Sequence, residues 1–224
     1  RRRLMSKLVL IRHGQSIYNL ENRFTGWEDV GLTEKGEKEA KEAASLLDGY
    51  QFSLAYTSEL KRAQKTLKIL LDEMSHRDIG IVKNIALNER DYGDLVGQNK
   101  AEAAEKFGAD MVQIWRRSYD TPPPGGESLK MTADRTIPFF NDVIRTQLKE
   151  TEGDIIVSAH GNSIRSIVMN LLELSPSEVL KTEIGWCEPW IFTFDGNDTI
   201  SSFKILSRDS DKSMSSIPES YLSV

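Results

Sequence analysis

The chain has 224 residues, a length that fits one α/β domain better than two small ones. Hydrophobic residues make up 39% and charged residues 28%, so the composition is that of an ordinary globular protein that can build a core without disulfides or metals. The net charge of −5 disfavours nucleic acid or an anionic membrane as the main partner, but it leaves room for a local basic pocket.

The cysteine content and the N-terminus bear on the cellular compartment. Cys187 is the only cysteine and cannot form an internal disulfide, so we expect a reducing, cytoplasmic environment. No apolar run approaches the length of about 18 residues that a membrane-spanning helix requires. The basic residues 1–3 precede no hydrophobic region of the kind found in signal peptides. We therefore interpret residues 1–5 as an extra N-terminal segment, with Met5 as a candidate start.

The first half of the chain alternates apolar runs with helical patterns. Residues 8–11, 52–56 and 79–82 have the apolar character of buried strands. One helix is predicted to begin after its N-cap, Thr33, and to end near residue 47. A second helix over about 59–74 is predicted to be capped by Thr57 and Ser58. Residues 84–98 look irregular, and short helices are expected over 100–107 and 111–117.

The second half begins with a loop, which the sequence TPPPGG predicts at residues 121–126. A long helix is predicted from Glu127 or Ser128 to about residue 148, with a kink or a division at Pro138. A strand over 154–159 precedes a helix over 163–172, and residues 190–194 and 200–206 are expected to pair as a hairpin. From about residue 207 the chain is rich in Ser, Asp and Lys, which predicts a mobile C-terminal tail over 207–224.

The alternation of strands and helices predicts the fold class. It indicates an α/β fold, a three-layer α/β/α sandwich around a mostly parallel sheet. The sequence has no repeat array and no linker long enough to divide it, so residues 1–224 are expected to form a single domain.

Two stretches share one pattern, an apolar strand followed by His-Gly, a polar amide, Ser and Ile. They are LVLIRHGQSI, which contains His13, and DIIVSAHGNSI, which contains His160. Because the carboxyl ends of parallel strands meet along one edge of a sheet, both histidines are expected to share one pocket. Gly14 and Gly161 would let the following backbone N–H groups approach an oxyanion. The alternative, that each histidine only caps its own strand, is disfavoured because the settings match; the third histidine, His76, reads as an ordinary surface residue.

Cationic side chains near these motifs indicate an anionic ligand. Arg12 precedes His13, and Arg62 falls in the first turn of a helix, where a cation opposes the helix dipole unless an anion lies between them. Lys100, Arg116 and Arg117 add further positive charge to an acidic chain. Guanidinium groups match the geometry of phosphate and carboxylate, so a small polyanion is predicted.

The role of His13 follows from these neighbours. A histidine serves as a metal ligand, a general base or a nucleophile, and the sequence has no second histidine or cysteine at metal-ligand spacing. Nearby arginines instead favour attack by the neutral imidazole on a phosphate monoester, which gives a covalent phosphohistidine. Such chemistry needs a proton donor for the leaving oxygen. Glu89, in the polar segment LNERDYG, is the leading candidate, and Asp91 competes with it.

Several segments together resemble the cofactor-dependent phosphoglycerate mutases of the histidine phosphatase superfamily. The resemblance covers residues 7–180, and RHG alone indicates only the superfamily, whereas NERDYG and WRR are typical of the mutase branch. The chain is similar to the shorter bacterial type, because a connection found in longer members is missing between Pro124 and Ser128. The matching segments are LIRHGQSIYN, ENRFTGW, GLTEKGEKEA, TSELKRAQKT, LNERDYGDLVGQNKAEAAEKFG, WRRSYDTPPPGGESL and SAHGNSIRSIV.

The resemblance implies a single catalytic domain with a phosphoglycerate mutase-like fold and a role for each matching residue. His13 would be the phosphorylated nucleophile and Glu89 the proton donor and acceptor. The residues that grip the transferred phosphoryl group would be Arg12, Arg62, Asn19 and His160, helped by Gly161. Those that hold the carboxylate and the other phosphate of the substrate would be Ser16, Thr25, Gly26, Tyr92, Lys100, Arg116, Arg117 and Asn162.

The same resemblance implies the reaction and the partners. The enzyme would interconvert 3-phosphoglycerate and 2-phosphoglycerate in glycolysis and gluconeogenesis, as an isomerase primed by 2,3-bisphosphoglycerate and without a metal. Its partner would be this small phosphorylated substrate rather than nucleic acid or a membrane, and family members imply a homodimer or homotetramer. Two other functions stay open: a phosphatase of the same superfamily, in which water takes the phosphoryl group, and a silent module that only binds phosphoanions.

Overall fold

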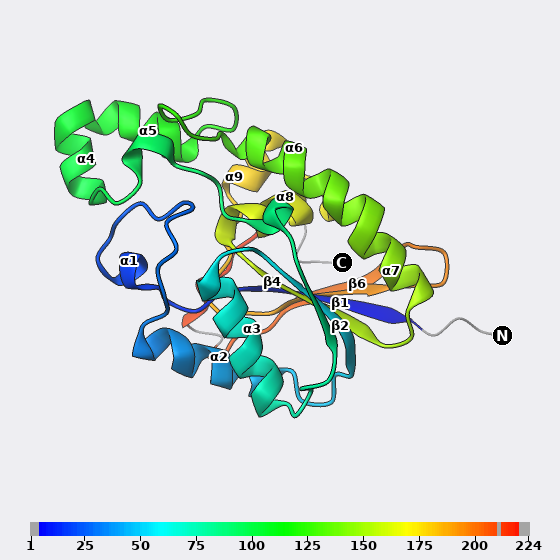
Figure 1. Ribbon diagram of the computed structural model, residues 1–224. Coiled ribbons are helices and arrows are strands. Elements are labelled where there is room, and N and C mark those ends of the chain that lie inside the picture. The colour runs from blue at the N-terminus through cyan, green and yellow to red at the C-terminus, as the bar shows by residue number, and fades with distance from the viewer. Residues whose placement is uncertain (1–4, 210–211, 220–224) are drawn as a thin grey trace.

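A six-stranded sheet forms the centre of the computed structural model, which describes residues 5–209 and 212–219 (Figure 1). The strand order is β3-β2-β4-β1-β5-β6. The first four strands of that order are parallel, whereas β5 runs antiparallel to both β1 and β6. This confirms the predicted mostly parallel sheet and the C-terminal hairpin. The strands are β1 (Ser6–Arg12), β2 (Phe52–Thr57), β3 (Gly80–Lys83), β4 (Asp154–Ala159), β5 (Trp190–Phe194) and β6 (Ile200–Ile205).

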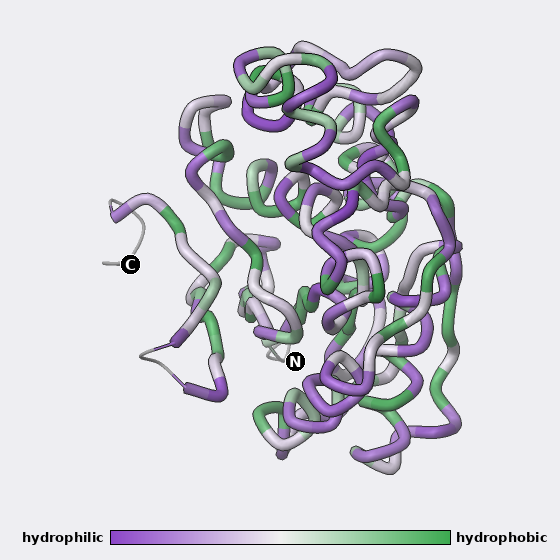
Figure 2. The backbone as a smooth tube through the Cα atoms, turned by 90° about the vertical axis from the view of Figure 1, so that its left-hand side faces the viewer, coloured by the Kyte–Doolittle hydropathy of each residue, from purple (hydrophilic) through white to green (hydrophobic). Residues whose placement is uncertain are grey.

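Helices cover both faces of the sheet, which confirms the three-layer architecture (Figure 1). In β1, Leu8 and Leu10 join the core cluster under the helices of residues 129–172, while Val9 and Ile11 join the cluster under the helices of residues 34–73. Because side chains alternate across a strand, a strand buried on both faces has to be apolar at every position. Figure 2 shows hydrophobic and hydrophilic stretches alternating along the backbone.

The main helices follow the predicted order. On one face lie α2 (Glu34–Leu46) and α3 (Lys61–Glu73); on the other lie α6 (Leu129–Phe139), α7 (Arg145–Glu150) and α8 (Gly161–Leu172). Outside these layers, α4 (Lys100–Phe107) and α5 (Ala109–Arg117) form a separate pair (Figure 1). Shorter elements are α1 (Ile17–Leu20), α9 (Pro176–Leu180) and the 3₁₀ turns η1 (Ile85–Leu87) and η2 (Gly93–Leu95).

Two local predictions need correction, and a third is refined. The N-cap of α3 is Leu60, whose apolar side chain makes no cap; the Ser58 hydroxyl accepts from the Leu60 N–H at 3.2 Å and also contacts a histidine ring described below. Helix α8 begins at Gly161, two residues earlier than predicted. The long helix is capped by Ser128, as predicted, and it is divided near Pro138: α6 ends at Phe139, and a π-helical turn, η3 (Phe140–Ile144), leads into α7. Proline lacks the N–H of a regular helical hydrogen bond, and the wider hydrogen-bond pattern of a π turn lets the chain continue as a helix.

The described part of the C-terminal segment packs against the body of the protein. Ser216 exchanges backbone hydrogen bonds of 2.9 and 3.0 Å with Glu183, and Ile217 is buried in the main core cluster. The polar composition of residues 207–224 predicts a mobile tail, whereas Ser216 and Ile217 pack against the body. Residues 210–211 and 220–224, like the predicted extra residues 1–4, lie outside the described residues.

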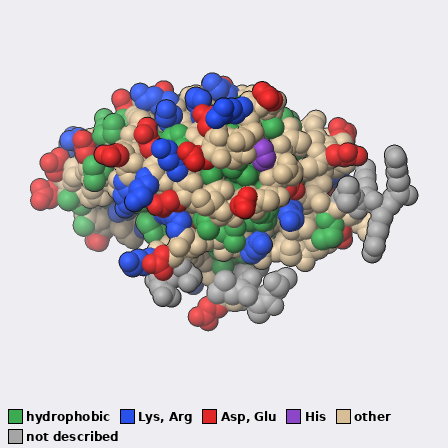
Figure 3. All heavy atoms as spheres, turned by 90° about the horizontal axis from the view of Figure 1, so that it is seen from below, with side chains coloured by type: hydrophobic (Ala, Val, Ile, Leu, Met, Phe, Trp, Pro, Cys, Tyr) green, Lys and Arg blue, Asp and Glu red, His purple; other side chains and the backbone are tan. Residues whose placement is uncertain are grey.

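The surface carries both signs of charge. On the face seen in Figure 3, Lys and Arg side chains are interspersed with Asp and Glu side chains. Across the described residues, no helix is long and apolar enough to cross a bilayer.

Candidate active site

The two histidine motifs meet at the carboxyl edge of the sheet. His13 follows β1 and His160 follows the neighbouring parallel strand β4, and the backbone N–H of His13 donates to the carbonyl of Ala159 at 3.1 Å. The two ring centroids lie 5.1 Å apart, and both side chains are buried. The two histidines are direct neighbours, as predicted, but only His13 lines the pocket that both were expected to share.

The orientation of the His13 ring is fixed on both sides. Its Nδ1 atom lies 2.6 Å from the carbonyl oxygen of Gly14, an acceptor, so this nitrogen carries the proton and donates. Its Nε2 atom therefore has the lone pair and accepts from Arg62 Nε at 3.4 Å. The ring presents an unprotonated nitrogen to the cations around it, which is the arrangement that a nucleophilic imidazole requires.

Burial and positive charge keep both imidazoles neutral. Burial first, then the guanidinium groups of Arg62 and Arg12, hold the pKa of His13 well below its usual range. Burial likewise lowers the pKa of His160, followed by Arg62, His13 and Arg12. His160 Nε2 contacts the Ser58 hydroxyl at 2.7 Å, whereas its Nδ1 atom is buried and has no hydrogen-bond partner within the described part of the chain.

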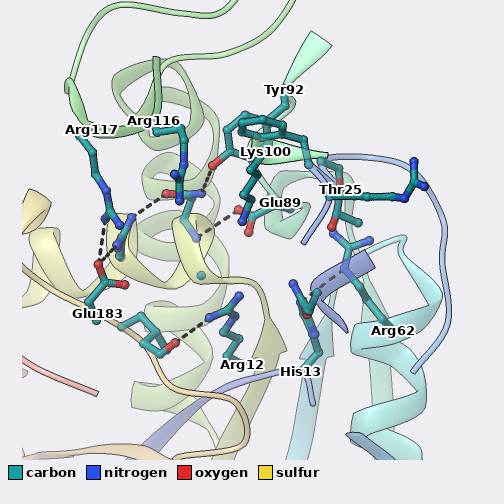
Figure 4. Close-up of a pocket in the computed structure, with 18 residues that line it drawn as sticks. Arg12, His13, Thr25, Arg62, Glu89, Tyr92, Lys100, Arg116, Arg117 and Glu183 are labelled. Atoms are coloured by element: carbon teal, nitrogen blue, oxygen red, sulfur yellow. Dashed lines mark hydrogen bonds and ion pairs between the residues drawn. The ribbon is translucent and has the colours of Figure 1, made fainter. Parts of the chain in front are cut away.

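Two arginines flank His13, the buried Arg62 and the half-buried Arg12 (Figure 4). Arg62 is held by the carbonyls of Gly26 and Glu28 at 2.8 and 3.0 Å, and burial lowers its pKa to about 10, so it stays charged at neutral pH. Arg12 donates from Nη1 to the carbonyl of Ile184 at 2.9 Å. Its buried Nε atom has no partner among residues 5–209 and 212–219. Because a buried donor without a partner is costly, it indicates an anion that completes the site.

The acidic member of the site is Glu89, which is buried on the segment after β3. Its Oε1 atom accepts from the backbone N–H groups of Arg90 and Asn162 at 2.7 and 3.1 Å. A Cβ atom on Gly161 would lie 3.8 Å from Glu89 Oε2 and 3.6 Å from the guanidinium carbon of Arg12, so Gly161 borders both groups. Asp91, the competing candidate, does not line the pocket and accepts from Gly93 N instead.

The pocket in front of His13 has a volume of about 160 Å³. Its far wall carries Lys100, from the start of α4, and Arg116 and Arg117, from the end of α5 (Figure 4). Burial, followed by the charges of Arg116 and Arg12, lowers the pKa of Lys100 to about 8. Seven cationic side chains and two carboxylates line this pocket, so it is shaped for a small ligand with more than one negative charge.

Comparison with known proteins decides the family. Residues 8–203 match the histidine phosphatase superfamily (branch 1). The chain is 53% identical over 190 residues to a 2,3-bisphosphoglycerate-dependent phosphoglycerate mutase of Parvibaculum lavamentivorans, a match that covers 84% of this chain and 90% of the relative. It is 49% identical over 202 residues to the protein of the same name from Brucella melitensis, which covers 89% and 98% of the two chains.

The chain belongs to the histidine phosphatase superfamily. Within it, the sequence relatives place the chain in the phosphoglycerate mutase family, as the resemblance predicts. A solved mycobacterial glucosyl-3-phosphoglycerate phosphatase has the same fold, with a TM-score of 0.74, 25% identity and coverage of 90% of this chain and 97% of that one. A solved protein titled mycobacterial hydrolase 2 gives a TM-score of 0.77 at 25% identity and covers 92% and 94%.

All but two of the site residues predicted for this family member line the pocket. His160 is fully buried and does not line the pocket, and Ser16 is a buried N-cap of α1 whose hydroxyl accepts from Asn19 N. The predicted residues that do line the pocket are Arg12, His13, Asn19, Thr25, Gly26, Arg62, Glu89, Tyr92, Lys100, Arg116, Arg117, Gly161 and Asn162. In the described chain, no three His, Cys, Asp or Glu side chains are grouped to hold a metal.

Five lining residues were missed by the sequence analysis. Arg23 and Phe24 lie inside the segment ENRFTGW, and Arg165 ends HGNSIR, so their motif positions could have revealed them. Glu183 and Ile184 lie in the loop between α9 and β5, where the resemblance does not extend. Nothing in the local sequence distinguishes Glu183 from a surface carboxylate.

Proposed function

We propose that this superfamily member is a phosphoglycerate mutase that interconverts 3-phosphoglycerate and 2-phosphoglycerate through a phosphohistidine on His13. Relatives at about 50% identity bear this name. The observation that carries the proposal is the unprotonated Nε2 atom of His13, directed at Arg62 and backed by a second histidine inside a cationic pocket.

His13 is suited to attack phosphorus in its neutral form. Its lowered pKa keeps the imidazole unprotonated at neutral pH, and its Nδ1–H bond to Gly14 fixes the tautomer. The guanidinium groups of Arg12 and Arg62 lie where the phosphoryl oxygens develop charge, and such preorganised donors lower the barrier to transfer. The ring of His160 lies beside that of His13, and its buried Nδ1 atom, which has no partner among the described residues, would donate to the same oxygens.

The primer fits this pocket. Arg12 Nε and His160 Nδ1 are two buried polar atoms that an anion would satisfy near His13, and Lys100, Arg116 and Arg117 would hold the other end. When bound, 2,3-bisphosphoglycerate supplies the phosphoryl group that charges His13. The remaining predicted contacts, from Ser16, Asn19, Thr25, Gly26, Tyr92, Gly161 and Asn162, are part of the same proposal.

Glu89 moves the proton. As the hydroxyl oxygen of 3-phosphoglycerate attacks the phosphorus on His13, its proton passes to Glu89 and the N–P bond breaks. In the opposite direction, Nε2 forms the N–P bond while Glu89 returns a proton to the leaving oxygen. Two backbone N–H bonds to Oε1 orient the carboxylate for both steps.

A coupled assay from 3-phosphoglycerate to 2-phosphoglycerate, with and without the primer, tests the proposal. We expect turnover that depends on 2,3-bisphosphoglycerate and is unchanged by EDTA. The alternative is a phosphatase, which the fold shared with a phosphatase suggests. Phosphate release as fast as isomerisation would favour that alternative, because water would then compete successfully for the phosphoryl group.

The proposal includes the setting of the enzyme. We place the activity in glycolysis and gluconeogenesis in the cytoplasm, in a single catalytic domain that assembles as a homodimer or homotetramer. The small phosphorylated substrate is its partner, in keeping with the anion-shaped pocket.

A further inference from the structure

Glu183 brings a carboxylate into the cationic far side of the pocket. It lies in the loop between α9 and β5, and its Oε1 atom is 2.9 Å from both Arg117 Nη1 and Arg165 Nη2 (Figure 4). All three side chains line the same pocket as His13. The proposed catalytic steps make no use of Glu183.

The two arginines come from different elements and converge on this one oxygen. Arg117 ends α5, whereas Arg165 lies in α8 and is positioned by the carbonyl of Thr182 at 2.7 Å and by Asn162 Oδ1 at 3.1 Å. Two guanidinium groups around a carboxylate oxygen form the arrangement with which proteins recognise a ligand phosphate or carboxylate. Glu183 therefore occupies a place that a ligand anion could take.

The contact can exchange with a ligand. The side chains of Glu183 and Arg117 are both 44% exposed, so this ion pair is weak because water screens it. The Arg165 side chain is 11% exposed, so its pair with Glu183 is screened less. The backbone of Glu183, in contrast, is fixed by its paired hydrogen bonds with Ser216. The carboxylate can leave the arginines by rotation of its side chain, without any rearrangement of the loop.

We propose that Glu183 is an internal counter-ion that competes with the second anionic end of the ligand for Arg117 and Arg165. It pairs these arginines while the pocket is empty and weakens the binding of ligands that carry two anionic groups. This inference rests on the proposed function, which supplies a ligand of that kind. It makes Glu183 a specificity-determining residue that sets how tightly the bisphosphate is held.

The test is the binding of 2,3-bisphosphoglycerate, measured by calorimetry in a His13→Ala background that blocks phosphoryl transfer. Removal of the carboxylate in Glu183→Gln should lower Kd by about three- to five-fold, the range that a weak screened ion pair allows. Glu183→Ala should act in the same direction. Asp198→Asn is the matched control, because Asp198 also bridges two cations, Arg145 and Lys149, but away from the pocket; its Kd should stay unchanged.

An unchanged or raised Kd in both Glu183 variants would overturn the inference, because the carboxylate would then support the arginines rather than compete with the ligand. The gain should also vanish when Arg117 and Arg165 are both replaced by alanine; a gain that persists there contradicts competition for these two groups. Failure of the proposed function is separate: the unaltered enzyme would then fail the isomerisation assay, whatever Glu183→Gln does to binding.

Discussion

At the scale of single residues, the contact between Arg62 and His13 carries the chemistry. Arg62 is buried with its charge directed at Nε2, and among the described residues no carboxylate forms an ion pair with it; its other donors satisfy two backbone carbonyls. A charged group held in this way is fixed before the substrate arrives, so its electrostatic effect needs little reorganisation in the transition state. The hydrogen bonds to these carbonyls offset part of the desolvation free energy of the buried guanidinium group.

We predict that Arg62→Ala lowers kcat by about 100-fold or more and changes KM much less, because the charge is most needed where negative charge develops in the transition state. Steady-state kinetics in the isomerisation assay measure both constants. Arg62→Lys is the matched variant: it keeps the charge but loses the planar fork, and we expect an intermediate kcat. A change confined to KM would show that Arg62 contributes only to substrate binding.

At the scale of elements, the loop after β1 is seated directly on the start of α2. A Cβ atom on Gly36 would come within 2.1 Å of the Gln15 carbonyl oxygen, and one on Gly14 within 2.3 Å of the Gly36 carbonyl oxygen. Thr33 N donates to the same Gln15 carbonyl at 3.0 Å. The N-terminus of α2 therefore fixes the position of the loop that carries His13.

We predict that Gly36→Ala lowers kcat/KM by roughly ten- to 100-fold, because the clash must displace the loop and a small misplacement of a nucleophile is costly. Overpacking should also destabilise the fold by about 1–3 kcal/mol. Gly31→Ala is the control, since the nearest atom to its added Cβ is the Lys61 Cε at 4.0 Å. Wild-type kinetics in Gly36→Ala would contradict this account of the loop.

The elements also show what the sequence could and could not predict. Strand β1 was predictable because all of its central residues face a core, whichever side they point to. Ser58 was misread as a helix cap, because its partner, His160, is 102 positions away and no local pattern reveals it. Glu183 was missed for the same reason: its two arginines come from α5 and α8.

At the scale of the whole molecule, the parallel sheet turns distant sequence motifs into one site. The alternating pattern predicted this edge and hence the meeting of His13 with His160. It could not predict the packing of Ile217, because a single apolar residue in a polar segment gives no periodic signal. A contact between distant residues can be predicted from the topology where both lie in a repeated motif. Where no motif repeats, only the structure reveals the contact.

Burial of two neutral histidines links the stability of the fold to pH. Their pKa values are lowered in the folded state, so the unfolded chain binds protons first as the pH falls. The free energy of unfolding should therefore decrease as the pH falls below about 6.5, by at most about 1.4 kcal/mol per pH unit for each histidine. Denaturant unfolding at pH 7.5 and 5.5 in phosphate-free buffer measures this. The double variant His13→Asn/His160→Asn should show a smaller decrease in the free energy of unfolding between these two pH values. An equal decrease would mean that the two histidines do not cause the pH dependence.

The most direct test of the central claim is a search for phosphate on His13. The protein is incubated with 2,3-bisphosphoglycerate labelled in its phosphoryl groups, and the label is mapped by peptide analysis. We predict one acid-labile label on His13, which is absent in His13→Ala. No label, or a label on another residue, would contradict the nucleophilic role of His13.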